Sequence, residues 1–178
     1  MNNNTITRIS LQGLPKVRPL KLVHPKFITI PYNWAMTTPK RNFKTYSFYH
    51  IYNRGNNKDE VLKYAEDKKL FISILYKNIK KTDLYLDGYC IMDNHYHLLI
   101  KTGRDPNIVP KFMQRVGTAF AMQINKKNKR IGHAFQGPYK ANLLRYKKDI
   151  ASVRTYIRNN PVERGLVKRG KHYPFSKM

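Results

Sequence analysis

The sequence predicts one α+β domain of the split βαβ type, also called ferredoxin-like, with an antiparallel sheet and one helix appended near its C-terminal end. Two kinds of apolar spacing support this fold. Aromatic and β-branched residues alternate with polar ones in the segments expected to be strands, and apolar residues recur every three or four positions in the segments expected to be helices. A length of 178 residues, 41% of them hydrophobic, suits one domain with a buried core.

The elements follow one another as strand, helix, strand, strand, helix, strand and a final helix. The first strand is indicated by ring-bearing residues at every second position from Tyr46 to Tyr52. The first helix opens at Asp59 and Glu60 and ends in lysines, so its charges complement the helix dipole. The predicted bounds are strands over residues 46–52, 84–92, 95–101 and 139–146, and helices over residues 59–81, 107–124 and 148–159.

Turn residues and prolines define the limits of the later elements, from the second strand to the last helix. Asp93-Asn94 is a tight-turn signal between two apolar segments, which predicts a β-hairpin. A second helix follows Pro106, and a loop containing glycines leads from it to the fourth strand. We expect Pro161 to end the last helix, because proline lacks the amide proton that a continuing helix needs.

The charge of the chain calls for an anionic partner. Lys and Arg number 35 against 10 Asp and Glu, which gives a formal charge of +25. Nucleic acid and anionic lipid are the usual partners of such a surplus. The sequence has no apolar run of 18 residues and no apolar secretory segment, so neither a membrane span nor a secretory signal is expected. No amphipathic membrane segment accompanies the charge, which favours nucleic acid over lipid as the partner. With Cys90 as the only cysteine, a reduced, cytoplasmic setting is expected.

Residues 1–43 differ from the rest and are predicted to form a basic, proline-containing N-terminal arm. No acidic residue precedes Asp59, and five prolines interrupt the first 39 residues. Such a segment is typical of an extended or disordered arm. A second interpretation is a misplaced start, since Met36 stands shortly before the first strand.

His95 and His97 are the first candidate site residues. They stand two positions apart at the beginning of a strand, so both imidazoles lie on one face of the sheet. Two neutral imidazoles suit a divalent metal and leave positions for water, substrate oxygen and one more protein ligand. The alternative is that the two histidines serve no common purpose.

Tyr156 and Asn160 are the second pair, spaced at i and i+4 on the last helix and therefore on one face of it. Tyr156 could instead be an aromatic residue at the edge of the core. Asn160 could instead be an N-cap, because Pro161 would fit the first position of a new helical turn.

Cations interleaved with aromatic residues form the third feature. Cations bind phosphates, and aromatic rings stack on unpaired bases, so this region predicts nucleic-acid binding, although lysines can also be a merely solvated face. The candidate DNA-binding residues are Arg54, Lys126, Lys127, Lys129, Arg130, Lys140, Arg145, Lys147 and Lys148.

Four linked motifs resemble one family, the REP-associated tyrosine transposases, which are single-tyrosine HUH transposases with the IS200-like domain. The motifs are YHIYNRGNN from Tyr49, YCIMDNHYHLLI from Tyr89, GHAFQG from Gly132 and YIRNNPV from Tyr156. The resemblance runs from about Tyr46 to Phe175, within a predicted domain of residues 44–178, in the order and approximate spacing of the family. It implies an HUH domain in which His95 and His97 bind the metal, Mg²⁺ or Mn²⁺, Asn160 is a third ligand and Tyr156 is the nucleophile.

The activity implied by this resemblance is cleavage and rejoining of single-stranded DNA near hairpins through a 5′-phosphotyrosine intermediate. The protein would then work in the cytoplasm, at the nucleoid when bound to DNA. A non-catalytic protein that binds nucleic-acid hairpins and an RNA-binding module of the same fold are the alternatives. The sequence leaves open the target site, the metal used in cells, whether the active unit is a monomer or a homodimer, and whether Tyr156 meets the histidines within one chain.

Overall fold

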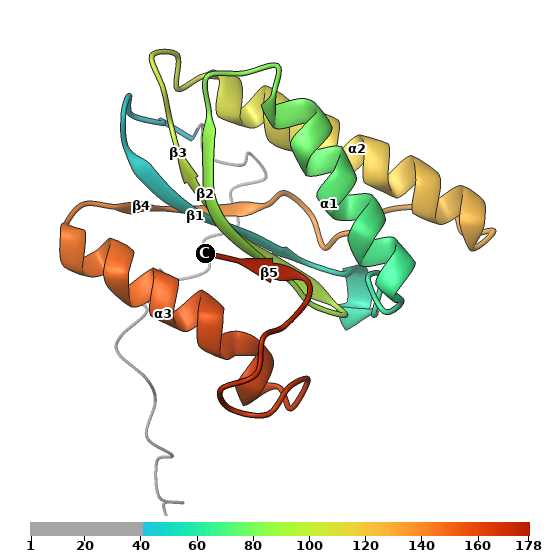
Figure 1. Ribbon diagram of the computed structural model, residues 1–178. Helices are drawn as coiled ribbons and strands as arrows, with labels where there is room; N and C mark the ends of the chain where they lie inside the picture. Colours follow the sequence, from blue (N-terminus) through green and yellow to red (C-terminus); the bar gives the residue numbers. More distant parts are fainter. Residues whose placement is uncertain (1–40) are drawn as a thin grey trace, which may run out of the picture. The chain divides into compact units, whose positions relative to one another are not determined.

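The computed structural model describes residues 41–178, which form one α+β domain with a five-stranded antiparallel sheet (Figure 1). The expected α+β class and the order of the first seven elements are confirmed. The strand order is β4-β1-β3-β2-β5, so β3 lies at the centre. The strands are β1 (Phe48–Arg54), β2 (Tyr85–Ile91), β3 (His95–Lys101), β4 (Lys140–Leu144) and β5 (Ser176–Lys177), and the helices are α1 (Ala65–Ile79), α2 (Ile108–Lys127) and α3 (Lys147–Glu163).

Helices cover both faces of the sheet (Figure 1). Because side chains alternate along a strand, β3 contributes to two separate apolar clusters. Leu98 and Ile100 pack with α1 and α2, whereas Leu99 packs with Ile157 of α3 on the other face. Arg154 of α3 also donates two hydrogen bonds to the Asp87 carboxylate of β2, at 2.9 and 2.8 Å. The face that carries α3 is the face that carries His95 and His97.

Helix α1 begins later than the sequence predicted. Its first residue is Ala65, and the expected acidic start at Asp59 lies in a loop that contains a short 3-10 turn at Asn56–Lys58. Asn57 and Lys58 have positive φ angles of 51° and 66°, which a helix cannot accommodate. The acidic residues of the first helical turn are instead Glu66 and Asp67.

Helix α3 passes through Pro161, which the sequence predicted to stop it. The helix ends at Glu163, one residue before Arg164, whose amide donates to the Asn160 carbonyl at 3.1 Å. A proline this close to the C-terminal end removes one intrahelical donor, which is a smaller loss than a break in the middle of a helix. Asn160 is therefore an interior helical residue, and the interpretation of Asn160 as an N-cap is wrong.

The ends of the described segment add two contacts that the sequence did not predict. Strand β5 comes from the C-terminal residues and pairs antiparallel with β2. Phe43 is buried, its ring centroid lies 4.8 Å from that of Tyr49, and the Arg41 guanidinium donates to the Tyr139 carbonyl at 2.6 Å. Packing onto the domain thus begins ahead of Lys44. The rest of the expected arm, residues 1–40, and the alternative start at Met36 lie outside the described residues.

Membrane-spanning potential can be assessed for residues 41–178. Each helix in this part of the chain is too short or too polar to cross a bilayer.

We expect the core between the sheet and α1 to depend strongly on Phe71. The side chain is fully buried, and its ring centroid lies 4.8 Å from that of Tyr96 and 5.2 Å from that of Phe120. Phe71→Ala should reduce the free energy of unfolding by about 3–5 kcal/mol, because it removes buried apolar surface and leaves a cavity. Urea denaturation measures this, with exposed Met122→Ala as the control within about 0.5 kcal/mol of the wild type. Equal midpoints for the two variants would contradict this core assignment.

Candidate active site

Strand β3 places the two histidines of the HYH motif on the sheet face covered by α3. The ring centroids of His95 and His97 lie 5.1 Å apart, with the ring planes at 85°. In the β1–β3 register, Tyr52 pairs with His97 and Arg54 with His95. The two imidazoles therefore share one site, as the strand periodicity predicted.

His95 is oriented by the residue before it. Its Nδ1 lies 2.6 Å from Asn94 Oδ1, and because an amide oxygen only accepts, His95 Nδ1–H is the donor. The Nε2 atom of the neutral ring then carries the lone pair. Burial lowers the pKa of His95, and the positive charges of Arg164 and Arg54 lower it further, whereas the Asn160 side chain and the negative charge of Asp93 oppose these effects.

His97 is almost completely buried, with 4% of its surface exposed. Burial lowers its pKa well below the ordinary value of 6.5, and positive charge on His50, His95 or Arg164 would lower it further. The imidazole is therefore neutral at pH 7. A neutral ring is the form that coordinates a metal.

Helix α3 brings Asn160 to the two imidazoles. Asn160 is 3% exposed, and its side-chain nitrogen Nδ2 lies 3.4 Å from His97 Nε2. The position depends on α3 remaining helical through Asn160 and Pro161, both of which are buried. The amide thus lies next to Nε2 of His97, the ring nitrogen that does not face His50.

Tyr156 lies one helical turn before Asn160 and reaches the same site. Its ring centroid is 5.4 Å from that of His97 and 6.1 Å from that of His50, in edge-to-face arrangements. The side chain is 38% exposed, so a substrate has access to it. A single chain therefore contains the tyrosine, both histidines and the asparagine, which was the arrangement that the sequence left open.

His50 is the member of this group that sequence reasoning did not select. It comes from β1, is 5% exposed, and its Nε2 lies 3.0 Å from His97 Nδ1. Burial lowers the pKa of His50 to about 4. Its place in the alternating strand was visible in the sequence, but the contact depends on the β1–β3 register, which no local pattern reveals.

The residues at this site fit a divalent metal. Two neutral imidazole nitrogens and an amide oxygen are all metal-ligating groups, and both histidines have a second partner that can orient the ring. Among residues 41–178, no group of three or more His, Cys, Asp and Glu side chains is placed to hold a metal. Within the described part of the chain, the site therefore offers an incomplete set of ligands, which leaves coordination positions for groups from outside the protein such as water.

The nine candidate cations do not form one patch. Lys147 and Lys148 begin α3 and Lys126–Arg130 lie at the C-terminal end of α2, on opposite sides of the view in Figure 1, whereas Arg54 ends β1 opposite His95. Lys140 and Arg145 are exposed at the two ends of β4. Lys127 and Arg130 form ion pairs with Asp67 and Asp59. Two of the nine are thus partly neutralised by carboxylates of the domain itself.

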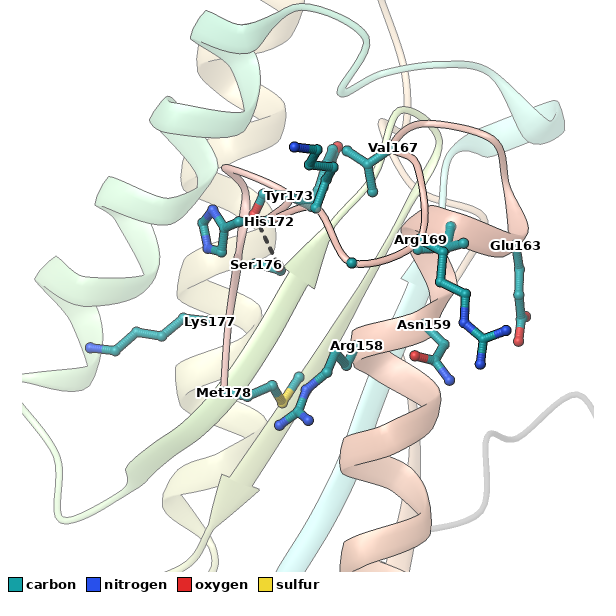
Figure 2. A pocket seen from close by; sticks show the side chains of 13 residues that line it. Arg158, Asn159, Glu163, Val167, Arg169, His172, Tyr173, Ser176, Lys177 and Met178 are labelled. Carbon is teal, nitrogen blue, oxygen red and sulfur yellow. Dashed lines mark hydrogen bonds between the residues drawn. The ribbon is translucent and has the colours of Figure 1, made fainter.

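A cavity of about 810 Å³ lies beside the site, between α3 and the C-terminal segment (Figure 2). Arg158, Arg169, Lys171 and Lys177 contribute to its lining, together with Glu163. Neither of the β3 histidines nor Tyr156 lines it. The cavity is therefore a cationic hollow separate from the histidine and tyrosine cluster.

Acid should destabilise the metal-free domain through its buried histidines. A histidine whose pKa is lowered on folding contributes stability above pH 6.5, and this contribution is lost as the pH falls from 6.5 toward the folded value, which is about 4 for His50. For His50 alone we expect a loss of about 2 kcal/mol between pH 7.5 and pH 5. Urea denaturation at the two pH values measures it.

The matched variants for this experiment are His50→Gln and His133→Gln, since His133 is exposed. The first should show a smaller loss of stability in acid than the wild type, and the second the same loss. An identical loss in all three proteins would contradict the assignment of the acid sensitivity to His50.

Comparison with known proteins identifies the family of this domain. Residues 44–160 match the model of the family described as "Transposase IS200 like". Among solved structures, a REP-associated tyrosine transposase bound to a REP hairpin matches with a TM-score of 0.65 and 17% identity, over 79% of this chain and 82% of that chain. A proposed transposase from Deinococcus radiodurans R1 matches with a TM-score of 0.48 and 19% identity, over 69% and 97% of the two chains. No curated protein matches.

The family match spans most of the chain and contains the four motifs except for the last two residues of the fourth. The solved hairpin complex, at its low sequence identity, adds that the fold is shared. The chain therefore belongs to the IS200-like transposase family, a family of DNA-binding transposases.

Proposed function

We propose that this protein is a metal-dependent single-stranded DNA endonuclease and strand transferase of the HUH type, in which Tyr156 attacks the DNA. The proposal depends on one observation, which is that Tyr156 and His97 lie close together within one chain, with 5.4 Å between their ring centroids. His95 and Asn160 lie next to His97. A protein that only binds DNA has no need of this combination. The β1-α1-β2-β3-α2-β4 order supports a ferredoxin-like HUH domain over residues 44–178.

In the proposed reaction, the Tyr156 hydroxyl oxygen attacks the phosphorus of a phosphodiester. A bond forms between the tyrosine oxygen and the 5′-phosphate, and the bond from phosphorus to the 3′-oxygen breaks. The phenol loses its proton, and the released 3′-oxygen takes one up to become a hydroxyl group. Because the phosphodiester bond is exchanged for a phosphotyrosine bond, the same steps in reverse can rejoin a 3′-hydroxyl end.

The side chains of His95, His97 and Asn160 would hold the metal, Mg²⁺ or Mn²⁺. When bound, such an ion polarises the scissile phosphate and stabilises the negative charge that develops on its oxygens. Asn94 keeps His95 in the form whose Nε2 lone pair can coordinate the metal. The exposure of Tyr156 on one side of the site leaves a path for a single strand to reach its hydroxyl group.

The proposed substrate is single-stranded DNA that carries a hairpin. Two observations support it, the net charge of +25 and the fold shared with a transposase whose solved structure holds a REP hairpin. The exposed cations around the site, Arg54, Lys140, Arg145, Lys147 and Lys148, are the proposed contacts to phosphates nearest the cleavage point. With such a substrate, we expect the activity in the cytoplasm, at the nucleoid.

Tyr156→Phe should abolish formation of a covalent protein–DNA adduct. The substrate is a pool of single-stranded oligonucleotides with a common hairpin and randomised flanks, labelled at the 3′ end, because the proposed link is to the 5′-phosphate of the downstream fragment. With Mn²⁺ or Mg²⁺, the wild type should transfer label to a band that survives denaturing gel electrophoresis. Tyr146→Phe, which alters an exposed tyrosine just before α3, is the matched control and should form the adduct.

Adduct formation by Tyr156→Phe at the wild-type level would refute the choice of nucleophile. If the wild type instead binds hairpin DNA in the presence of chelator and forms no adduct with either metal, the protein is a non-catalytic hairpin binder.

The affinity for DNA should depend on salt through the cations at the beginning of α3. Replacing both Lys147 and Lys148 with Ala should weaken binding and reduce the slope of log K against log salt by about 0.7 for each phosphate that the variant no longer neutralises. Fluorescence anisotropy at several salt concentrations measures the slope. The control is Lys80→Ala with Lys81→Ala, two exposed lysines at the end of α1, which should leave the slope unchanged. A reduced slope in the control alone would place the DNA on the other side of the domain.

A further inference from the structure

The contact between His50 and His97 is buried and joins two strands. His50 Nε2 on β1 lies 3.0 Å from His97 Nδ1 on β3, and the two side chains are 5% and 4% exposed. Two facing ring nitrogens at this distance form a hydrogen bond only if one carries a proton and the other a lone pair. The pair therefore has two possible arrangements, and they differ in which nitrogen of His97 is protonated.

Asn160 discriminates between the two arrangements. Its Nδ2 group, which can only donate, lies 3.4 Å from His97 Nε2, so Nε2 must carry a lone pair. A neutral imidazole has one proton, and that proton is then on Nδ1. It follows that His97 Nδ1–H donates to His50 Nε2. The opposite arrangement would place the proton of Nε2 against the amide protons of Asn160.

We propose that His50 is a positioning residue, which accepts a hydrogen bond from His97 and thereby holds His97 with the lone pair of Nε2 directed toward Asn160 and the ligand position. This inference rests on the proposed function, since Nε2 matters as a metal ligand. Asn94 does the same for His95, because its Oδ1 accepts from His95 Nδ1–H at 2.6 Å. Each proposed ligand thus has its own partner, and such partners orient metal-binding histidines and raise their affinity for metal.

The surroundings of His50 hold the acceptor in place. Its ring packs against Tyr52 of the same strand and Tyr156 of α3, with centroid separations of 5.0 and 6.1 Å. The β-ladder fixes the backbone at the same time, since His50 pairs with Leu99 of β3 and with Asn142 of β4. Strand pairing on both sides and ring packing above leave the His50 imidazole little freedom to turn away from His97.

The first test reads the tautomer directly in the metal-free protein without DNA. Long-range ¹H–¹⁵N spectra of ¹⁵N-labelled wild type at pH 7.5 separate a protonated ring nitrogen from one with a lone pair. We expect the proton of His97 on Nδ1 and the lone pair on Nε2. A His97 ring protonated on Nε2 would overturn the proposal.

The second test separates the acceptor from the bulk of the side chain. In His50→Gln, the amide oxygen Oε1 can take the place of the Nε2 acceptor, whereas His50→Leu fills space without accepting. We expect Mn²⁺ to bind His50→Leu about 10–100-fold more weakly than wild type and His50→Gln within about threefold of it. Titration of free Mn²⁺ by electron paramagnetic resonance measures the affinity, and His172→Leu, at an exposed histidine, is the control.

The outcomes are separable from those of the proposed function. Unchanged Mn²⁺ affinity and an unchanged His97 tautomer in His50→Leu would refute the positioning role. If His50→Leu does not fold, the wild-type tautomer and the affinity of His50→Gln still decide, since a tenfold loss in the glutamine variant contradicts the proposal. A failed phosphotyrosine experiment alters none of these measurements, because they use neither DNA nor Tyr156.

Discussion

The burial of β3 on both faces is the constraint on which the site depends. An isolated sheet face with two histidines would be solvated, and its imidazoles would be free to turn and to take up protons. Here Leu98 and Ile100 attach β3 to the layer of α1 and α2, while Leu99 holds the other face against α3. The helix that completes the hydrophobic packing is also the helix that carries Tyr156 and Asn160. Folding and assembly of the site are therefore one event.

Helix α3 must hold Asn160 in place at the same turn in which Pro161 removes a helical hydrogen bond. Pro161 weakens the helix at the turn where Asn160 must be held, yet both residues are buried, so tertiary packing offsets the missing hydrogen bond. The Arg154–Asp87 pair fixes the middle of α3 to β2 with two charge-assisted hydrogen bonds. The spacing of four residues then places Tyr156 and Asn160 on the face that looks toward His97.

Local patterns in the sequence were enough for most of the fold and for the pairing of His95 with His97 and of Tyr156 with Asn160, two pairs that the fold then brings together. The bounds of β3 at His95–Lys101 were predicted to the residue, because a turn and an alternating strand define both ends. The start of α1 was wrong, since the backbone at Asn57 and Lys58 overrides the acidic signal that follows. Strand β5 and the contact of His50 with His97 were not foreseen, because both depend on pairing between segments distant in the sequence.

The ion pairs of the candidate cations could not be predicted either, because they join residues that are far apart in the sequence. Composition identified Lys127 and Arg130 as candidates for phosphate binding, but it could not show that α2 brings them to Asp67 and Asp59. Their carboxylate partners stand 60 and 71 positions away in the sequence. Pairing of this kind is visible only once the fold is known.

These ion pairs belong to a larger separation of charge within the domain. Residues 59–105 hold eight acidic residues and eight Lys and Arg, whereas residues 106–178 hold two acidic residues and 17 Lys and Arg. The region of α1 is thus close to electroneutral, and the excess is carried by α2 and the loop after it, by β4 and α3, and by the C-terminal segment. An uneven distribution of this kind gives the domain an electric dipole. The field of a polyanion exerts a torque on this dipole. With the proposed DNA substrate, this torque would turn the domain before any contact forms, so that orientation precedes recognition.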